Sequence, residues 1–428
     1  MINSTIGGGM ARQSFVLFAA SGLCFLYPLL LINNYLDYRL LSLLFTLGAF
    51  VLVFIVASAN NWVRPVLFLV LTAFMMHGFF ITSHYAFNGP EHYLWAVDTY
   101  NQHLKKALTF KDFLSGNSPL VILDSDNFYN RNYISAMVVG FFFFLGDTNP
   151  FFSSLAMIVV KCFTIILIFN TVRNITRSQQ IAVISSFLYI INPDVFYYTL
   201  IFYKEFFVHF LVALFFYFIS CVKPKYLMAF IPIALMYIDR FYLSVFLFVS
   251  LIVIFIAKEK PSIGVFLTIF ISSFVLGMLV IKSITGNYNI YSFFDRFLSH
   301  KLHYSLNSNA KVSMGFFLDF IRISFTPFIN IFTVEKFSNY SSLLIAGGVF
   351  HKAVMMMYFY GLSRFHRSPI VWINLTVLAL LILFALIGPF NGRVRDSIYP
   401  IIVMWAGIGL NTFLIEIKKI SCWEHEKD

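Results

Sequence analysis

Residues 151–171, FFSSLAMIVVKCFTIILIFNT, contain a single charged side chain, Lys161. A helix needs about 20 mainly apolar residues to cross the hydrocarbon core of a bilayer, so this run predicts a transmembrane helix. The next apolar run, residues 180–198, follows a short basic turn that contains Arg173 and Arg177. These two runs predict a pair of membrane helices joined by a tight connection.

The composition of the whole chain agrees with a membrane protein. Of the 428 residues, 60% are hydrophobic and 11% are charged, whereas a soluble domain has about 25% charged residues. The 55 phenylalanines outnumber the 30 basic and 19 acidic residues together. So few charges exclude a soluble enzyme, a nucleic-acid-binding domain and a disordered chain. The net charge of +11 is therefore interpreted as a signal of membrane topology, with no nucleic-acid partner.

The apolar runs predict an all-α polytopic membrane protein with about 12 transmembrane helices. These runs are residues 14–36, 40–58, 65–83, 151–171, 180–198, 204–222, 226–238, 241–257, 262–282, 341–362, 369–389 and 397–416. Asp239-Arg240 interrupts the pattern between two short runs and predicts a tight hairpin there. We expect residues 1–428 to form one membrane domain, whose first run is retained and not cleaved as a signal peptide.

The orientation of the chain in the membrane is predicted from the basic residues in the segments that connect the apolar runs. The apolar segment 133–146 is short for a span and is expected to be re-entrant or interfacial. If it does not cross, most basic residues fall on alternate connections, and the positive-inside rule predicts that both termini are cytoplasmic. Residues 84–132 and 283–340 are then two large external loops. The segments 291–306 and 314–325 are expected to form interfacial helices.

With this orientation, the charged residues that are not explained by topology gather on the external side. They are Asp98, Asp124, Asp126, Lys204, Glu205, Asp239, Arg240, Arg393 and Arg395. Charges kept at membrane depth are costly and are functional candidates for that reason. The cluster predicts an outward-facing site for a polar or anionic substrate.

The carboxylates of the first external loop are candidates for acid–base chemistry. Asp98 is placed to act as a general base, with the interfacial residue Tyr100 in support; the alternative is a solvated loop aspartate. Asp124 and Asp126 have the spacing of a DxD pair that binds Mg²⁺ or Mn²⁺, and an Asx-capped turn gives the same spacing. The metal ligands therefore stay undetermined, and no cofactor is firmly implied.

The basic candidates are suited to phosphate. Arg393 and Arg395 precede the last apolar run, where two guanidinium groups would bind a pyrophosphate or a lipid phosphate; the alternative is anchoring to lipid head groups. Arg240 has the same two interpretations. Lys204 either binds a phosphate oxygen or forms a structural pair with Glu205. His209, like His77 and His351, is expected to be a hydrogen-bonded interior histidine.

The order of these features resembles the GT-C superfamily of polytopic glycosyltransferases. The resemblance rests on Asp98 in the first large external loop, on FFFFLG at 141–146, on the helix–basic turn–helix stretch that ends in Asn192-Pro193, and on FNGRVRDSIYP at 390–400. The chain departs from the family's pattern in its two additional leading spans and in Thr99, which stands where an Asp-Glu pair is common. The second departure leaves metal dependence open.

The resemblance implies an inverting glycosyltransferase of the bacterial inner membrane that acts at the external face. Its partners would be an undecaprenyl-phosphate-linked sugar donor, a glycan or lipid acceptor, and membrane lipids. Asp98 would be the catalytic base. Lys204, Arg240, Arg393 and Arg395 would lie near the donor phosphates, with Glu205, Asp124, Asp126 and Tyr100 in supporting positions.

Two alternatives stay open. The first is an O-antigen or exopolysaccharide polymerase, which takes repeat units from a lipid pyrophosphate. The second is a polysaccharide or lipid transporter or flippase, which needs no catalytic base but needs polar residues along a path through the membrane. Few polar residues lie within the predicted spans; they include His77, Lys161, His209 and Lys352.

Overall fold

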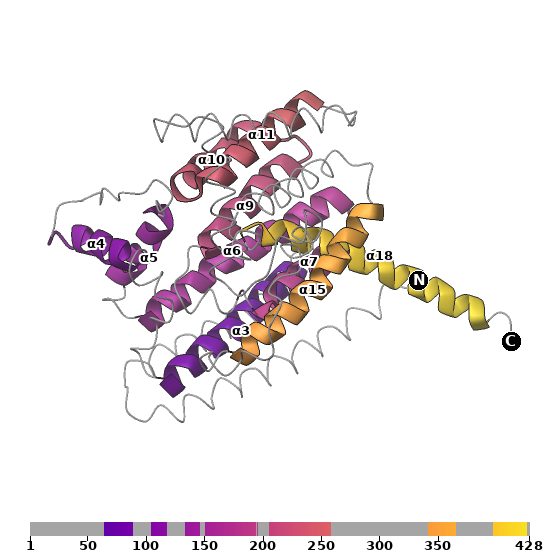
Figure 1. Cartoon of the computed structure of the whole chain (residues 1–428), viewed down its shortest axis with the longest axis horizontal. Coiled ribbons are helices and arrows are strands. Elements are labelled where there is room, and N and C mark those ends of the chain that lie inside the picture. Colours follow the sequence, from indigo (N-terminus) through magenta and orange to yellow (C-terminus); the bar gives the residue numbers. More distant parts are fainter. Residues whose placement is uncertain are drawn as a thin grey trace, which may run out of the picture. The chain divides into compact units, whose positions relative to one another are not determined.

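The computed structural model describes residues 64–88, 104–117, 133–145, 150–193, 195, 205–257, 341–364 and 397–425 (Figure 1). Within these ranges the regular structure consists of ten helices and no strand, which confirms the all-α prediction. The helices are α3 (Arg64–Asn88), α4 (Lys105–Leu114), α5 (Tyr133–Leu145), α6 (Pro150–Thr176), α7 (Gln179–Ile190), α9 (Glu205–Ser220), α10 (Tyr226–Asp239), α11 (Phe241–Ala257), α15 (Ser341–Arg364) and α18 (Tyr399–His425).

Every predicted apolar run that falls in the described ranges contains a helix. The runs 14–36, 40–58, 262–282 and 369–389 and the external loop 283–340 lie outside the described residues, so the total of about 12 spans stays a prediction. Two of the described helices contain segments that are long and apolar enough to cross a membrane, Met157–Thr176 and Tyr399–Lys418. The segment 133–146 forms α5, whose 13 residues extend about 20 Å.

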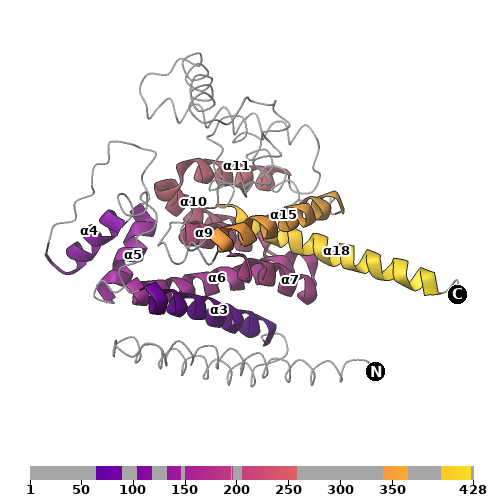
Figure 2. The ribbon, with the colours of Figure 1, turned by 60° about the horizontal axis from the view of Figure 1, so that its bottom comes forward.

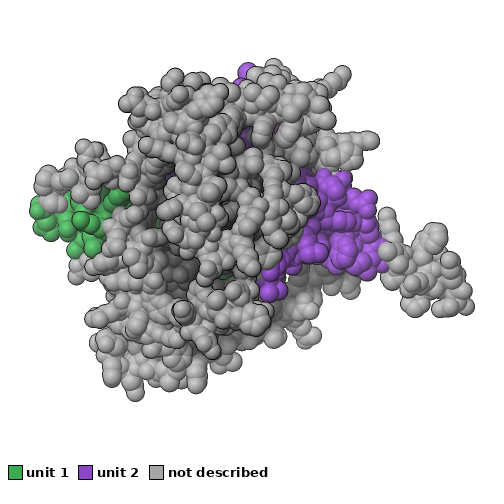
Figure 3. All heavy atoms as spheres, in the orientation of Figure 1, with its two compact units in different colours: residues 1–124, 132–173, 177–210 green, residues 125–131, 174–176, 211–428 purple. Residues whose placement is uncertain are grey.

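The chain divides into two compact units, coloured separately in Figure 3. Unit 1 comprises residues 1–124, 132–173 and 177–210, and unit 2 comprises residues 125–131, 174–176 and 211–428. The prediction of a single membrane domain stays a prediction.

Unit 1 contains one tight helix connection and one close helix packing. The turn from α6 to α7 is closed by Arg177, whose φ of 57° is in the left-handed region and whose N–H donates to the carbonyl of Arg173 (2.9 Å). Ser178 then caps α7, since its hydroxyl accepts from the N–H of Ile181 (3.3 Å). Helices α4 and α5 pack against each other at Gly140, where a Cβ would meet the carbonyl oxygen of Ala107.

Unit 2 contains the hairpin that Asp239-Arg240 predicts, and its helices are antiparallel. The ring centroids of Tyr226 and Phe255 are 5.5 Å apart, and those of Phe230 and Phe248 are 5.9 Å apart. Closer to the turn, the hydroxyl of Ser244 donates to the carbonyl of Ile233 (2.8 Å). Contacts between α10 and α11 therefore extend from the open end of the hairpin to its turn. This arrangement confirms the predicted break into two helices.

The second helix pair of unit 2 is parallel. His351 of α15 lies beside Tyr399, the first residue of α18, with ring centroids 6.0 Å apart. Further along both helices, Tyr360 packs on Phe413 (5.9 Å) and Arg364 pairs with Glu416 (3.3 Å). The two helices thus advance in the same direction, as Figure 2 shows.

Candidate functional site

Most of the predicted site lies outside the residues that the structure describes. This holds for Asp98, Tyr100, Asp124, Asp126, Lys204, Arg393 and Arg395. Glu205 and Arg240 are described, and they belong to different units.

Glu205 is the first residue of α9 and is 0% exposed. A carboxylate in the first turn is favoured by the helix dipole, because the N-terminal N–H groups there have a partial positive charge. His209, also buried, follows four residues later and therefore lies on the same face of α9. Both side chains on this face of the first turns of α9 are buried.

Arg240 is the single residue that separates α10 from α11, and it is 8% exposed. Its N–H donates to the carbonyl of Met236 (2.6 Å) and so ends α10. Its own carbonyl accepts from the N–H of Leu243 (3.0 Å) and of Ser244 (3.1 Å) and so begins α11. These bonds fix the backbone from which the guanidinium extends, with the buried Asp239 beside it.

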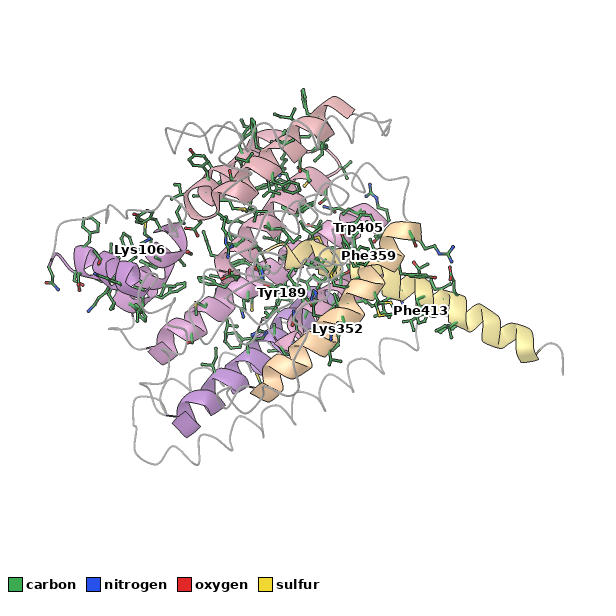
Figure 4. All side chains as sticks on the ribbon, viewed as in Figure 1. Lys106, Tyr189, Lys352, Phe359, Trp405 and Phe413 are labelled. Atoms are coloured by element: carbon green, nitrogen blue, oxygen red, sulfur yellow. The ribbon has the colours of Figure 1, made fainter. Side chains whose placement is uncertain are left out.

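A cluster of buried polar side chains lies within unit 1. We call it the polar cluster; it consists of His77 on α3, Lys161 and Thr164 on α6, Tyr189 on α7 and His209 on α9. All five side chains are buried, and Figure 4 shows Tyr189 among the side chains packed between the helices. The cluster joins four helices through groups that can donate or accept protons.

Lys161 and His77 form one end of the polar cluster. The Nζ of Lys161 donates a hydrogen bond to the carbonyl of Val195, the position that follows the end of α7 by five residues. His77 lies within electrostatic range of Lys161 and contacts the main chain of Ile190. Side chains from α3 and α6 thus converge on the end of α7.

Tyr189 and His209 form the other end of the polar cluster. The phenol oxygen of Tyr189 lies 3.0 Å from Nδ1 of His209, and the two rings meet edge to face with centroids 5.7 Å apart. Tyr189 also hydrogen-bonds Thr164 of α6, one turn from Lys161. This geometry confirms that His209 is a hydrogen-bonded interior histidine.

The sequence singles out His77, Lys161 and His209 separately, but it indicates neither Thr164 and Tyr189 nor the association of the five residues. Lys161 stands out as the only charge in its apolar run, which by itself marks a functional candidate. His77 and His209 lie 84 and 48 positions away in sequence, and only the packing of the helices brings them together. Among the described residues, no group of three or more His, Cys, Asp or Glu side chains could hold a metal ion.

Comparison of the chain with protein-family models, with curated proteins and with solved structures finds no match.

Proposed function

We propose that this protein is a membrane glycosyltransferase. It moves a sugar from an undecaprenyl-phosphate-linked donor to a hydroxyl of a glycan or lipid at the external face of a bacterial inner membrane. The observation that supports the proposal is the helix order of unit 1. Helix α6 ends at a basic turn, α7 ends before Asn192-Pro193, and Glu205 opens α9, which is the order of elements on which the resemblance to GT-C enzymes rests.

In the proposed reaction Asp98 takes the proton of the acceptor hydroxyl. The acceptor oxygen forms a bond to the anomeric carbon as the bond from that carbon to the donor phosphate oxygen breaks. The phosphate leaves with the electron pair, and the configuration at the anomeric carbon is inverted. The cationic side chains of Lys204, Arg240, Arg393 and Arg395 stabilise the charge that develops on the leaving phosphate.

The parallel course of α15 and α18 supports the position proposed for Arg393 and Arg395. If both helices cross the membrane in the same direction, the chain between them must cross in the opposite direction an odd number of times, and the predicted run 369–389 supplies one such crossing. Both arginines directly precede α18 in sequence. They would then lie at the membrane face opposite to Arg364 and Lys418, away from the cytoplasm.

The donor class separates the glycosyltransferase from the polymerase. Purified protein in nanodiscs is supplied either with an undecaprenyl-phosphate monosaccharide or with an undecaprenyl-pyrophosphate oligosaccharide, each radiolabelled in the sugar. We expect label to reach the acceptor from the monosaccharide phosphate only. Transfer from the pyrophosphate alone, with a ladder of products, would identify the polymerase instead.

The polar cluster favours one second candidate, a transporter or flippase. Such a protein needs polar groups within its spans, and His77, Lys161, Tyr189 and His209 are of this kind. It predicts that a labelled undecaprenyl-phosphate lipid crosses a vesicle bilayer in the absence of any acceptor. The glycosyltransferase predicts no crossing in the same vesicles.

A further inference from the structure

We propose that helix α4 docks on the surface of the bilayer and binds the anionic head groups of phospholipids there. Helix α4 belongs to the predicted first external loop and has the lysine-rich sequence KKALTFKDFL. Docking of α4 is independent of the proposed glycosyltransferase activity, which does not use the residues of this helix.

Helix α4 is fixed on helix α5, because the backbones of the two helices touch. Gly140 of α5 lies against the carbonyl of Ala107, which is 0% exposed. A Cβ on Gly140 would also lie 3.2 Å from the Cβ of Phe110. The ammonium of Lys106, which is labelled in Figure 4, lies 4.4 Å from the ring centroid of Tyr133, the first residue of α5. The position of α5 in the membrane therefore determines the position of α4.

Both ends of α5 are expected near the external face of the membrane. Its first residue follows the predicted external loop. Helix α6 ends at the basic turn that the positive-inside rule places in the cytoplasm, so Pro150, the first residue of α6, is expected at the external face. The connection from the end of α5 to Pro150 reaches at most about 18 Å. The 13 residues of α5 extend about 20 Å, which is less than the hydrocarbon core of about 30 Å. Helices α5 and α4 are therefore expected at the external boundary of the bilayer.

One face of α4 combines aromatic rings with a lysine. Lys106, Phe110 and Phe113 occupy positions i, i+4 and i+7 and therefore lie on the same face of the helix; we call them the aromatic stripe. The rings of Phe110 and Phe113 stack with centroids 6.1 Å apart. Phe113 is 38% exposed, although its side chain is large and apolar. Amphipathic helices insert such rings at the boundary between the head groups and the acyl chains of a bilayer.

The charge of α4 is complementary to an anionic lipid surface. Lys105 is exposed, and Lys106 and Lys111 are half-buried, whereas Asp112 is the only acidic residue of the helix. Lysine can place its stem along an apolar surface and its ammonium among polar groups. Each lysine close to an anionic membrane surface strengthens binding roughly fivefold. A basic helix with an aromatic stripe, held at the bilayer boundary, therefore fits phospholipid phosphates.

Hydrogen–deuterium exchange on the full chain tests the proposal in nanodiscs of two compositions, phosphatidylcholine alone and phosphatidylcholine mixed with phosphatidylglycerol. In the wild type we expect amide protection in peptides that cover residues 105–114 to rise at least about fivefold with the anionic lipid. Because salt screens contacts between exposed charges, this increase should shrink at high salt. Protection in α15 should not change, which distinguishes docking of α4 from a general effect of the lipid on the protein.

Matched variants test the lysines. The double variant Lys105→Gln/Lys111→Gln removes two charges from α4 and should lose most of the increase in protection. The variant Lys105→Arg/Lys111→Arg keeps both charges and should keep the increase. The control Lys223→Gln/Lys225→Gln removes two exposed lysines between α9 and α10 and should also keep it.

The aromatic stripe has its own variant. Phe113→Ser should lower the protection of α4 in both nanodiscs, because insertion of an apolar ring does not depend on the charge of the lipid. Val222→Ser, at an exposed position between α9 and α10, should leave this protection unchanged. Equal protection of α4 in the two nanodiscs would overturn the proposal, as would a double glutamine variant of Lys105 and Lys111 with the full wild-type increase.

Discussion

Gly361 on α15 and Gly409 on α18 bring the backbones of two parallel helices into direct contact. A Cβ on Gly361 would lie 3.0 Å from the backbone nitrogen of Gly409 and 3.2 Å from its Cα. A Cβ on Gly409 would meet the carbonyl oxygen of Met357 and lie 2.8 Å from the nitrogen of Gly361. Small residues of this kind are the usual means by which membrane helices approach closely.

The first prediction follows from this contact. Because backbone atoms surround both glycines, a side chain at either position must push the helices apart. Gly409→Leu should therefore destabilise the protein by about 1–3 kcal/mol or more, measured as the free energy of unfolding by sodium dodecyl sulfate in mixed micelles. Ala353→Leu introduces the same side chain at an exposed position of α15; it is the control and should be close to neutral.

A second prediction compares two buried tyrosines. The hydroxyl of Tyr189 bonds His209, whereas the hydroxyl of Tyr358, also fully buried, has no hydrogen-bond partner among the described residues. Tyr189→Phe should cost about 1–3 kcal/mol, because it removes a partner from a buried polar group. Tyr358→Phe should be neutral or stabilising in the same unfolding measurement. Equal losses in both variants would contradict the hydrogen bond to His209.

The turn between α6 and α7 gives a third prediction. Arg177 occupies the left-handed region, which costs about 1–2 kcal/mol for a residue with a Cβ. Glycine removes this strain, but it also increases the conformational entropy of the unfolded chain, which lowers the free energy of unfolding by about 0.4–1 kcal/mol. Arg177→Gly should therefore stabilise the protein slightly, with thermal unfolding as the measurement. Arg173→Gly, four residues earlier within α6, should destabilise it instead.

A fourth prediction concerns the far ends of α15 and α18. Glu416 accepts a hydrogen bond from the hydroxyl of Tyr360 and pairs with Arg364. The interaction of Arg364 with the side chain of Tyr360, followed by the negative charge of Glu416, raises the pKa of Arg364. This guanidinium therefore stays charged wherever the protein is folded. Because the pair is exposed, salt should screen it. Glu416→Gln should lower the melting temperature far less than Gly409→Leu does. The difference in melting temperature between the Glu416→Gln protein and the wild type should shrink at high salt.

Nine of the ten described helices could be predicted from the sequence, because each of them overlaps an apolar run bounded by charges or by proline. Helix α4, with the lysine-rich sequence KKALTFKDFL, lies in the predicted external loop and was not predicted. Asp239-Arg240 marks the hairpin because two adjacent charges do not fit within a short apolar run, and the structure places the helix break there. The parallel packing at Gly361 and Gly409 could not be predicted, since 47 residues separate these glycines and nothing in either run specifies its neighbour. The polar cluster could not be predicted for the same reason, because its members lie on four helices.

For the site, the sequence predicts only a set of residue types on one face of the membrane. Of that set, Glu205 and Arg240 are buried at helix ends, where partial charges of the backbone favour an ionised side chain or fix its direction. The sequence pattern does not give burial of this kind, because it depends on helices from other parts of the chain.

The central claim is that Asp98 is the base of a sugar transfer from a lipid-linked donor. The measurement that tests it most directly is transfer of radiolabelled sugar from an undecaprenyl-phosphate donor by Asp98→Asn protein in nanodiscs, with Asp112→Asn as the matched control from helix α4. We expect the Asp98→Asn protein to fold like the wild type and to form at least about 100-fold less product, the contribution of a general base, while the Asp112→Asn protein stays active. Wild-type product formation by the Asp98→Asn protein would contradict the claim.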